Sequence, residues 1–301
     1  MCTNIREYVI AVMDRLGFDG ESCEELSASL DRILNDEASE AEFRRIIGIY
    51  EENVYYDAPS LLEDMNALSA SVGVHEYAGG LLLHLALCEP LEKRYAEMGI
   101  SEEIFKNSMK DLLYKNNECR LIKGMCGSFV CHWFYGFYKL IRFGIGRLQY
   151  QIGPLNFDYN YRGIELTKDT LALHVHIPRT GGPMTRSDVL QSYQMAKTFF
   201  AKYFPDKFEN RPTVITCQSW LLAPFHTVLL SEKSNIRGFI TDFEMVNTGT
   251  YDNYGNAWRI FDAPFDGDLS KIPRDTSIRR IYTEKIEKGE PFEWGCGVFV
   301  I

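Results

Sequence analysis

The segment PRTGGPMTR, residues 178–186, lies between a predicted strand and a predicted helix and has a composition suited to anion binding. Gly181 and Gly182 can adopt positive φ and let the backbone approach a ligand closely. The N–H groups of a helix's first turn favour a negative charge, and Arg179 and Arg186 would add attraction. The segment therefore predicts a pyrophosphate site, although a Gly-Gly-Pro sequence can also form a tight strand-to-helix connection without any ligand.

Two histidines come immediately before this segment. His174 and His176 alternate with apolar residues over 171–177, so both imidazoles are predicted on one face of the strand. An imidazole with an ordinary pKa of about 6.5 can accept a proton near neutral pH. The alternative is that helices cover this face and that both histidines are hydrogen-bonded packing residues.

These residues would be carried by a mixed α/β sheet. Short β-branched or aromatic segments bounded by Gly, Pro or Asn predict strands at 146–155, 170–178, 213–222, 238–246, 256–262 and 297–301. Helical spacing lies between several of them, at 187–204, 225–233 and 276–288. Strands that alternate with helices predict a mixed sheet flanked by helices, an α/β (α+β) fold. Thr185, with Asp188 three residues later, predicts a capped start for the 187–204 helix.

The first part of the chain has helical spacing throughout. Apolar residues recur at intervals of three and four up to about Asn117, where the period changes. We therefore expect a helical N-terminal domain over residues 1–117 and the α/β domain over residues 118–301.

Composition limits the classes of function. The chain has 301 residues and a formal net charge of −10, which argues against a nucleic-acid backbone as the main partner. Its apolar runs are too short for a membrane span, and we expect a cytoplasmic protein without a membrane partner. The eight cysteines are expected to be reduced and mostly buried, and the Cys119, Cys126, Cys131 group lacks the short spacing of a zinc site, so no metal is expected.

Several ordered motifs resemble a bacterial family of acyltransferases. They are RFGIGRLQYQIGPL, the segment from HVHIPRTGGPMTR to KYFP, CQSWLLAP, SNIRGF, and the ending TSIRRIYTEKIEKGEPFEWGCGVFVI. That family joins a helical N-terminal N-acyltransferase domain to a C-terminal domain of the GNAT (N-acetyltransferase) type. The resemblance covers nearly the whole chain and implies a helical domain followed by a GNAT-like mixed sheet.

The resemblance also implies a cofactor site for coenzyme A or acyl-CoA as co-substrate. The GNAT loop Arg/Gln-x-x-Gly-x-Gly/Ala binds the pyrophosphate, and this sequence matches it at Arg179 and Gly182. Met184 replaces the small residue, and Pro183 lacks an amide donor. The resemblance implies that donor-binding groups lie at Val175, Ile177, Arg179, Thr180, Gly181, Gly182, Met184, Thr185 and Arg186.

The implied reaction is direct attack of a small-molecule or peptide amine on the acyl-CoA thioester. Such chemistry needs a base for the amine, for which His176, nearer the loop, is preferred over His174, and a proton source for the thiolate. Ser219 could supply that proton or orient the substrate. Cys217, which shares its face opposite Gln218, is more simply a core thiol than a nucleophile.

A second hypothesis belongs to a different class of function. A GNAT-like module could bind an acyl-CoA or a protein partner and act as a sensor or scaffold without catalysis. The departure at Met184 and the lack of an assured base favour this alternative, whereas the arginine, the glycines, the capped helix and the polar face of the adjacent strands favour the enzyme. The acceptor, the acyl chain length and the oligomeric state cannot be inferred from the sequence.

Overall fold

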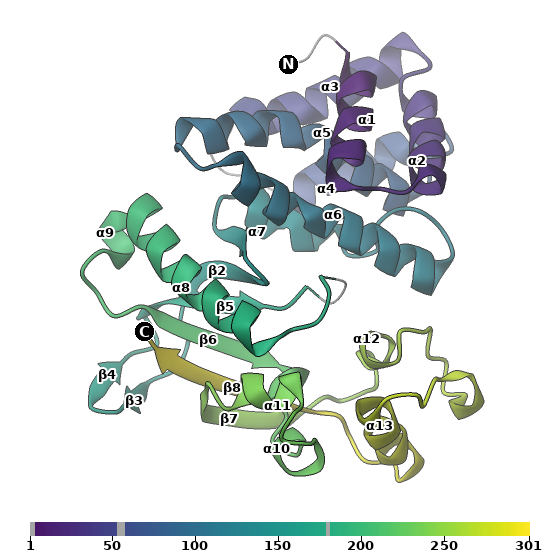
Figure 1. Cartoon of the computed structure of the whole chain (residues 1–301). Helices are drawn as coiled ribbons and strands as arrows, with labels where there is room; N and C mark the ends of the chain where they lie inside the picture. Colours follow the sequence, from purple (N-terminus) through teal and green to yellow (C-terminus); the bar gives the residue numbers. More distant parts are fainter. Residues whose placement is uncertain (1–3, 53–57, 179–180) are drawn as a thin grey trace. The chain divides into compact units, whose positions relative to one another are not determined.

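The computed structural model describes residues 4–52, 58–178 and 181–301, and the chain forms two compact units, Met1–Gly144 and Ile145–Ile301 (Figure 1). The boundary lies later than the expected one at residue 117. That position falls inside α6 (Glu102–Lys123), a continuous helix that Ser101 caps at its start and Gly124 ends in the left-handed conformation. The change of period near Asn117 is therefore not a break in the chain's path.

The first unit is helical, as expected, and is built around one buried helix. Its long helices are α1 (Ile5–Leu16), α2 (Gly20–Ile33), α3 (Glu37–Glu52), α4 (Ala58–Ser71), α5 (Glu76–Glu97) and α6. Every residue of α5 from Ala78 to Cys88 is buried, and α5 contacts each of the other five. A helix that is apolar on all sides is stable only when neighbours surround it, so α5 occupies the centre. The short helices η1 (Cys131–Phe134) and α7 (Tyr135–Tyr138) follow α6.

A six-stranded mixed sheet forms the main part of the second unit, and its first strand begins just before the boundary at residue 145. Its strands are β1 (Arg142–Ile145), β2 (Leu148–Pro154), β5 (Leu171–His176), β6 (Val214–Ser219), β7 (Glu244–Thr250) and β8 (Glu293–Val300), in the spatial order β1-β2-β5-β6-β8-β7. Strands β5 and β6 are parallel, whereas β2 with β5, β6 with β8, and β7 with β8 are antiparallel. The expected mixed sheet is confirmed.

Helices cover one face of this sheet. α8 (Arg186–Tyr203) runs over the centre of the sheet, with α11 (Asn235–Ile240) beside it (Figure 1). Tyr193 of α8 packs edge-on against Phe299 of β8, and Ser192 hydrogen bonds to Tyr150 of β2. Side chains that alternate with these along the strands face the other side, which we call the open face.

The excursion between β2 and β5 reaches across to the far edge of the sheet. It contains the hairpin β3 (Tyr159–Tyr161) and β4 (Ile164–Leu166). Tyr159 donates a hydrogen bond to Glu244 on β7, and Arg162 forms an ion pair with the same carboxylate at 2.6 Å. Glu244 is paired with Val298 of β8, so the excursion ties β2 to the opposite edge.

An insertion between β7 and β8 has its own core. It carries α12 (Ala257–Phe261), η3 (Leu269–Lys271) and α13 (Ser277–Glu287), with Phe261, Tyr282 and Phe292 fully buried together. The predicted strand at 256–262 is wrong, because Ala257, Ile260 and Phe261 meet this core at helical spacing. The predicted strand at 238–246 is also wrong in its first half, where α11 ends at Ile240 before β7 begins.

Candidate active site

The two parallel strands β5 and β6 pair over only two positions. The pairs are Leu173 with Ile215 and His174 with Thr216. Both strands continue, β5 to His176 alongside β2 and β6 to Ser219 alongside β8. We call the region past the last pair, residues 175–176 and 217–219, the wedge. Strand edges carry amide and carbonyl groups that need partners, so this region suits a ligand that has amides of its own.

A cavity of about 410 Å³ opens on the open face at the apex of this wedge. We call it the sheet cavity. It is lined by Leu155, Asn156, Phe157, His174, Thr216, Gln218, Val246, Asn247, Trp294 and Cys296. The lining combines amide, hydroxyl, imidazole and indole groups with apolar walls, which is the usual character of a small-molecule site.

His174 lies at the apex, with one ring nitrogen fixed. Its Nε2 lies 2.9 Å from the carbonyl oxygen of Pro154, so Nε2 carries the hydrogen and Nδ1 is the basic nitrogen. A Cβ at Gly153 would lie 3.3 Å from Nε2, so a residue without a side chain leaves room for the ring. Burial lowers the pKa of His174, which keeps the imidazole neutral near pH 7.

The other residues proposed for catalysis are divided between the two faces. His176 shares the open face with His174, opposite Gln149, but the cavity lining includes His174 and not His176. Cys217 and Ser219 alternate with Thr216 and Gln218 and so lie on the face that α8 covers. Burial raises the pKa of the Cys217 thiol, and Ser219 Oγ accepts a hydrogen bond from the amide of Leu221 at 3.2 Å.

The segment that follows β5 leads into a capped helix, as expected. Thr185 is the N-cap of α8, where its Oγ1 accepts from the amide of Asp188 and donates to that residue's carboxylate. Gly182 has φ +86°, a conformation that favours glycine. Arg179 and Thr180 lie outside the described residues.

The remaining residues predicted to bind the donor differ in exposure and partners. Val175 is buried on the face of α8, paired with Tyr150 of β2, and Ile177 is half-buried just after the strand. Met184 is buried. Arg186 forms an ion pair with Asp242 at 2.5 Å, so its charge is shared with a carboxylate and not held for a ligand alone. Within the described residues, this leaves backbone amides as the groups of the segment and of the first turn of α8 that could contact an anion.

Sequence reasoning did not identify most of the cavity. Thr216 and Gln218 alternate with Cys217 and Ser219, so the sequence pattern of β6 places Thr216 and Gln218 on one face. The pattern does not predict which strands lie beside β6. Asn156, with φ +71°, and Asn247 come from separate loops and strands and carry no local motif. Their common location depends on the sheet order, which short-range patterns do not encode.

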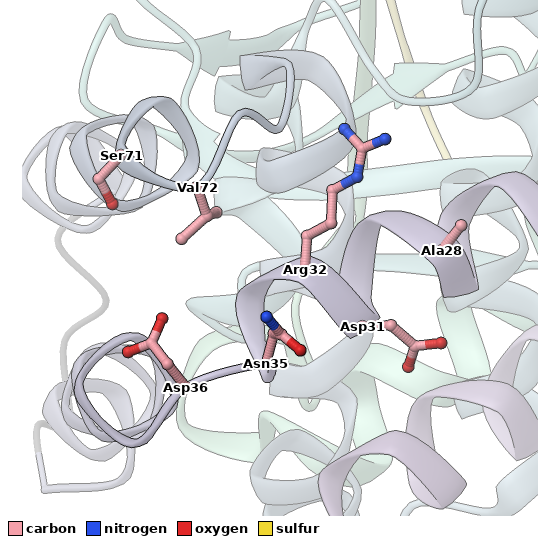
Figure 2. Close-up of a pocket in the computed structure, with 7 residues that line it drawn as sticks. All are labelled: Ala28, Asp31, Arg32, Asn35, Asp36, Ser71 and Val72. Carbon is pink, nitrogen blue, oxygen red and sulfur yellow. The ribbon is translucent and has the colours of Figure 1, made fainter.

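Another hollow lies in the helical unit (Figure 2). It has a volume of about 470 Å³ and is lined by Ala28, Asp31, Arg32, Asn35, Asp36, Ser71 and Val72. Its charged groups have structural partners. Asp31 pairs with Arg6 at 2.5 Å, Arg32 donates to the carbonyl of Gly73, and Asp36 caps the start of α3 through the amides of residues 38 and 39. These roles account for the charged residues there.

The cysteines of the described ranges are free thiols, most of them buried, as expected for reduced core residues. In those same ranges the structure contains no group of three or more His, Cys, Asp or Glu side chains that could hold a metal ion. No helix outside the gaps at 1–3, 53–57 and 179–180 has the length and apolar character needed to cross a membrane.

Two family models match the chain and together cover nearly all of it. The model described as GNAT-like C-terminal domain matches residues 142–299, and the model described as N-acyltransferase N-terminal domain matches residues 7–140. No curated protein matches in sequence.

Solved structures share the fold at low sequence identity. An acyltransferase in complex with decanoyl-CoA and teicoplanin has a TM-score of 0.76 at 19% identity, covering 100% of this chain and 91% of that one. An acyltransferase mutant with octanoyl-CoA has a TM-score of 0.77 at 19% identity, covering 97% and 87%. An acyltransferase with CoA and 10C-teicoplanin has a TM-score of 0.74 at 19% identity, covering 96% and 86%.

Proposed function

Because this chain belongs to the family with an N-acyltransferase N-terminal domain and a GNAT-like C-terminal domain, we propose that it transfers an acyl group from acyl-CoA directly to an amine. One observation carries the proposal. The pairing of β5 with β6 ends at His174 and Thr216, and the sheet cavity opens at that same point. A donor in the wedge and an acceptor in the cavity would meet there.

The donor is proposed to bind along the wedge and the loop beyond it. The pantetheine arm of coenzyme A has two amide groups that can hydrogen bond to strand edges, such as the backbone of Val175 and Ile177. Its pyrophosphate is proposed to lie against the amides near Gly181 and Gly182 and at the start of α8. The roles of Arg179 and Thr180 remain proposals from the resemblance.

The chemical step is proposed to have no acyl-enzyme intermediate. The amine nitrogen forms a bond to the thioester carbon, the C–S bond then breaks, and coenzyme A leaves as the thiolate. His174 is proposed as the base, because its Nδ1 is available for a proton while Nε2 is held by Pro154. This assignment replaces the sequence preference for His176, which is proposed as a neighbouring polar residue of the open face.

Ser219 is proposed as the proton source for the thiolate. Its hydroxyl oxygen accepts from Leu221, which leaves the hydroxyl proton for donation. It lies at the end of β6 on the face opposite His174, so the base and the acid would act from opposite sides of the wedge. Cys217 has no proposed role in the chemistry, because burial disfavours its thiolate.

The acceptor is proposed to be the amine of a small molecule or peptide that enters the sheet cavity. Two of the similar solved structures contain teicoplanin or its 10C derivative, which supports a small-molecule acceptor here. A cytoplasmic location is consistent with the use of acyl-CoA.

Two measurements test this function. A donor that binds only the folded state must raise its unfolding temperature, so thermal unfolding with coenzyme A and acyl-CoAs of increasing chain length should show a shift. Mass spectrometry of reactions with a panel of amines should then show acylated products and free coenzyme A. Binding without transfer would favour the sensor or scaffold alternative, and absence of any shift would contradict donor binding altogether.

A further inference from the structure

Arg147 lies in the short connection between β1 and β2 and contacts the segment that follows β5. Its guanidinium donates three hydrogen bonds to backbone carbonyls there. Nη1 donates to Pro178 at 3.0 Å, Nη2 to Gly182 at 2.7 Å and Nε to Pro183 at 3.1 Å. The planar group therefore joins the two sides of the segment between β5 and α8.

The neighbouring glycines are matched to this contact. A Cβ at Gly181 would lie 3.2 Å from Nη1 of Arg147 and 3.5 Å from its Cζ, and the first of these distances is tighter than an ordinary van der Waals contact. Gly146, which precedes Arg147, has φ +61° and allows the sharp reversal between β1 and β2. The reversal brings Arg147 to the segment from a distant part of the sequence.

The contact also sets the direction of one amide, that of Met184. In a trans peptide unit the carbonyl and the N–H point in opposite directions, and no described peptide bond is cis. Because the carbonyl of Pro183 is turned toward Arg147, the N–H of Met184 is directed away from the guanidinium. The Met184 N–H, one residue before the N-cap of α8, is thus available to an anion on the side of the segment opposite Arg147.

We propose that Arg147 is a positioning residue for the donor, which holds residues 181–184 in the conformation in which the Met184 amide and the first turn of α8 bind the pyrophosphate. This inference rests on the proposed use of acyl-CoA. It assigns Arg147 no contact with the donor and no part in the chemical step. Its effect should therefore depend on whether the donor carries a pyrophosphate.

The test compares an acyl-CoA with the corresponding acyl-pantetheine, which has the same acyl chain and thioester but no pyrophosphate. Arg147→Met removes the donors and keeps most of the side-chain volume, and Arg147→Lys keeps the charge without the planar fork. For Arg147→Met we expect affinity for acyl-CoA, measured by calorimetry, to fall about ten- to a hundredfold, the range for hydrogen bonds to a charged group. Affinity for acyl-pantetheine should stay within about threefold, and Arg147→Lys should recover only part of the loss.

Gly181→Ala tests the same contact from the other side. Its added methyl group should displace the guanidinium and weaken acyl-CoA binding in the same selective way. Arg211→Met, which removes an exposed arginine elsewhere in the second unit, is the control and should bind both donors as the wild type does. Circular dichroism and thermal unfolding establish that each variant is folded.

The outcomes separate this inference from the function on which it rests. If the wild type binds neither donor, the proposed function fails. If the wild type binds acyl-CoA and Arg147→Met binds it equally well, the positioning role is overturned. An equal loss for both donors would also overturn it, because a general structural defect does not distinguish them. Should Arg147→Met fail to fold, the same criteria apply to Arg147→Lys and Gly181→Ala.

Discussion

The tautomer of His174 determines what this residue can do. Because Nε2–H is held by the carbonyl of Pro154, only Nδ1 can take a proton from an amine, and burial lowers the pKa of the imidazole. A base with a lowered pKa stays active to lower pH. Wild-type kcat/KM should therefore fall only below about pH 6.5 as far as this group is concerned.

His174→Gln tests that assignment. The substitution should lower kcat/KM by about a hundredfold or more and remove the acidic fall attributed to the imidazole. His176→Gln, on the same face of the same strand, is the matched control and should keep the acidic fall. Rates measured from about pH 5 to pH 9 compare the two variants. If His174→Gln keeps the wild-type pH profile of kcat/KM and His176→Gln loses the acidic fall, the base is His176, as preferred from the sequence.

Cys217 provides a test of direct transfer. Incubation with radiolabelled acyl-CoA and no amine should leave no acid-stable label on the protein, since burial keeps the thiol protonated. Cys217→Ser should retain activity, apart from the modest stability loss of placing a hydroxyl in the core. Stoichiometric label that disappears in Cys217→Ser would show a covalent mechanism.

At the scale of elements, two substitutions at Gly182 can distinguish the effect of an added charge from the effect of backbone strain. Its φ of +86° makes any side chain there strained, but a Cβ added to Gly182 would have no other atom within 4 Å. Gly182→Asp and Gly182→Asn share the strain and differ in charge. We expect the Asp variant to bind coenzyme A at least about tenfold more weakly than the Asn variant by calorimetry, because its carboxylate would face the phosphates. Equal affinities would argue against a pyrophosphate at this position.

The elements that sequence patterns predicted are those that depend on near neighbours. Thr185 and Asp188 predict the start of α8 because a cap is decided within one turn, and alternation over 171–177 predicts which side chains of β5 share a face. The same reasoning predicted the wrong element at 256–262, because a short apolar run is compatible with a strand or a helix. Packing against the core of the insertion makes it a helix. The pairing of His174 with Thr216 depends on the order of the strands in the sheet. The contact of Arg147 with Gly182 depends on the β1–β2 turn, which is distant in sequence. Local sequence patterns predict neither contact.

At the scale of the whole molecule, each unit contains a buried neutral histidine. Burial lowers the pKa of His84 in the helical unit to about 4 and that of His226 in the second unit to about 4. In the unfolded chain each takes up a proton below about pH 6.5, whereas in the folded state it stays neutral. Stability should therefore fall as the pH drops from about 6.5 toward 4, by about 1.4 kcal/mol per pH unit for each histidine.

Urea unfolding between about pH 4.5 and pH 7 measures this dependence. His84→Gln and His226→Gln should each reduce the slope of unfolding free energy against pH by one proton, in the transition of the unit that carries it. A slope unaffected by either buried substitution would mean that those imidazoles titrate normally in the folded state.

The two-position pairing between β5 and β6 has a consequence for the protein's lifetime in a cell. The strands β1, β2 and β5 on one side and β6, β8 and β7 on the other share a short ladder, so amides beside it should exchange with deuterium sooner than those inside either group. A donor bound along the wedge would hold the two groups of strands together and slow that exchange. Because proteases degrade a protein through its opened forms, its abundance should then rise and fall with the supply of acyl-CoA.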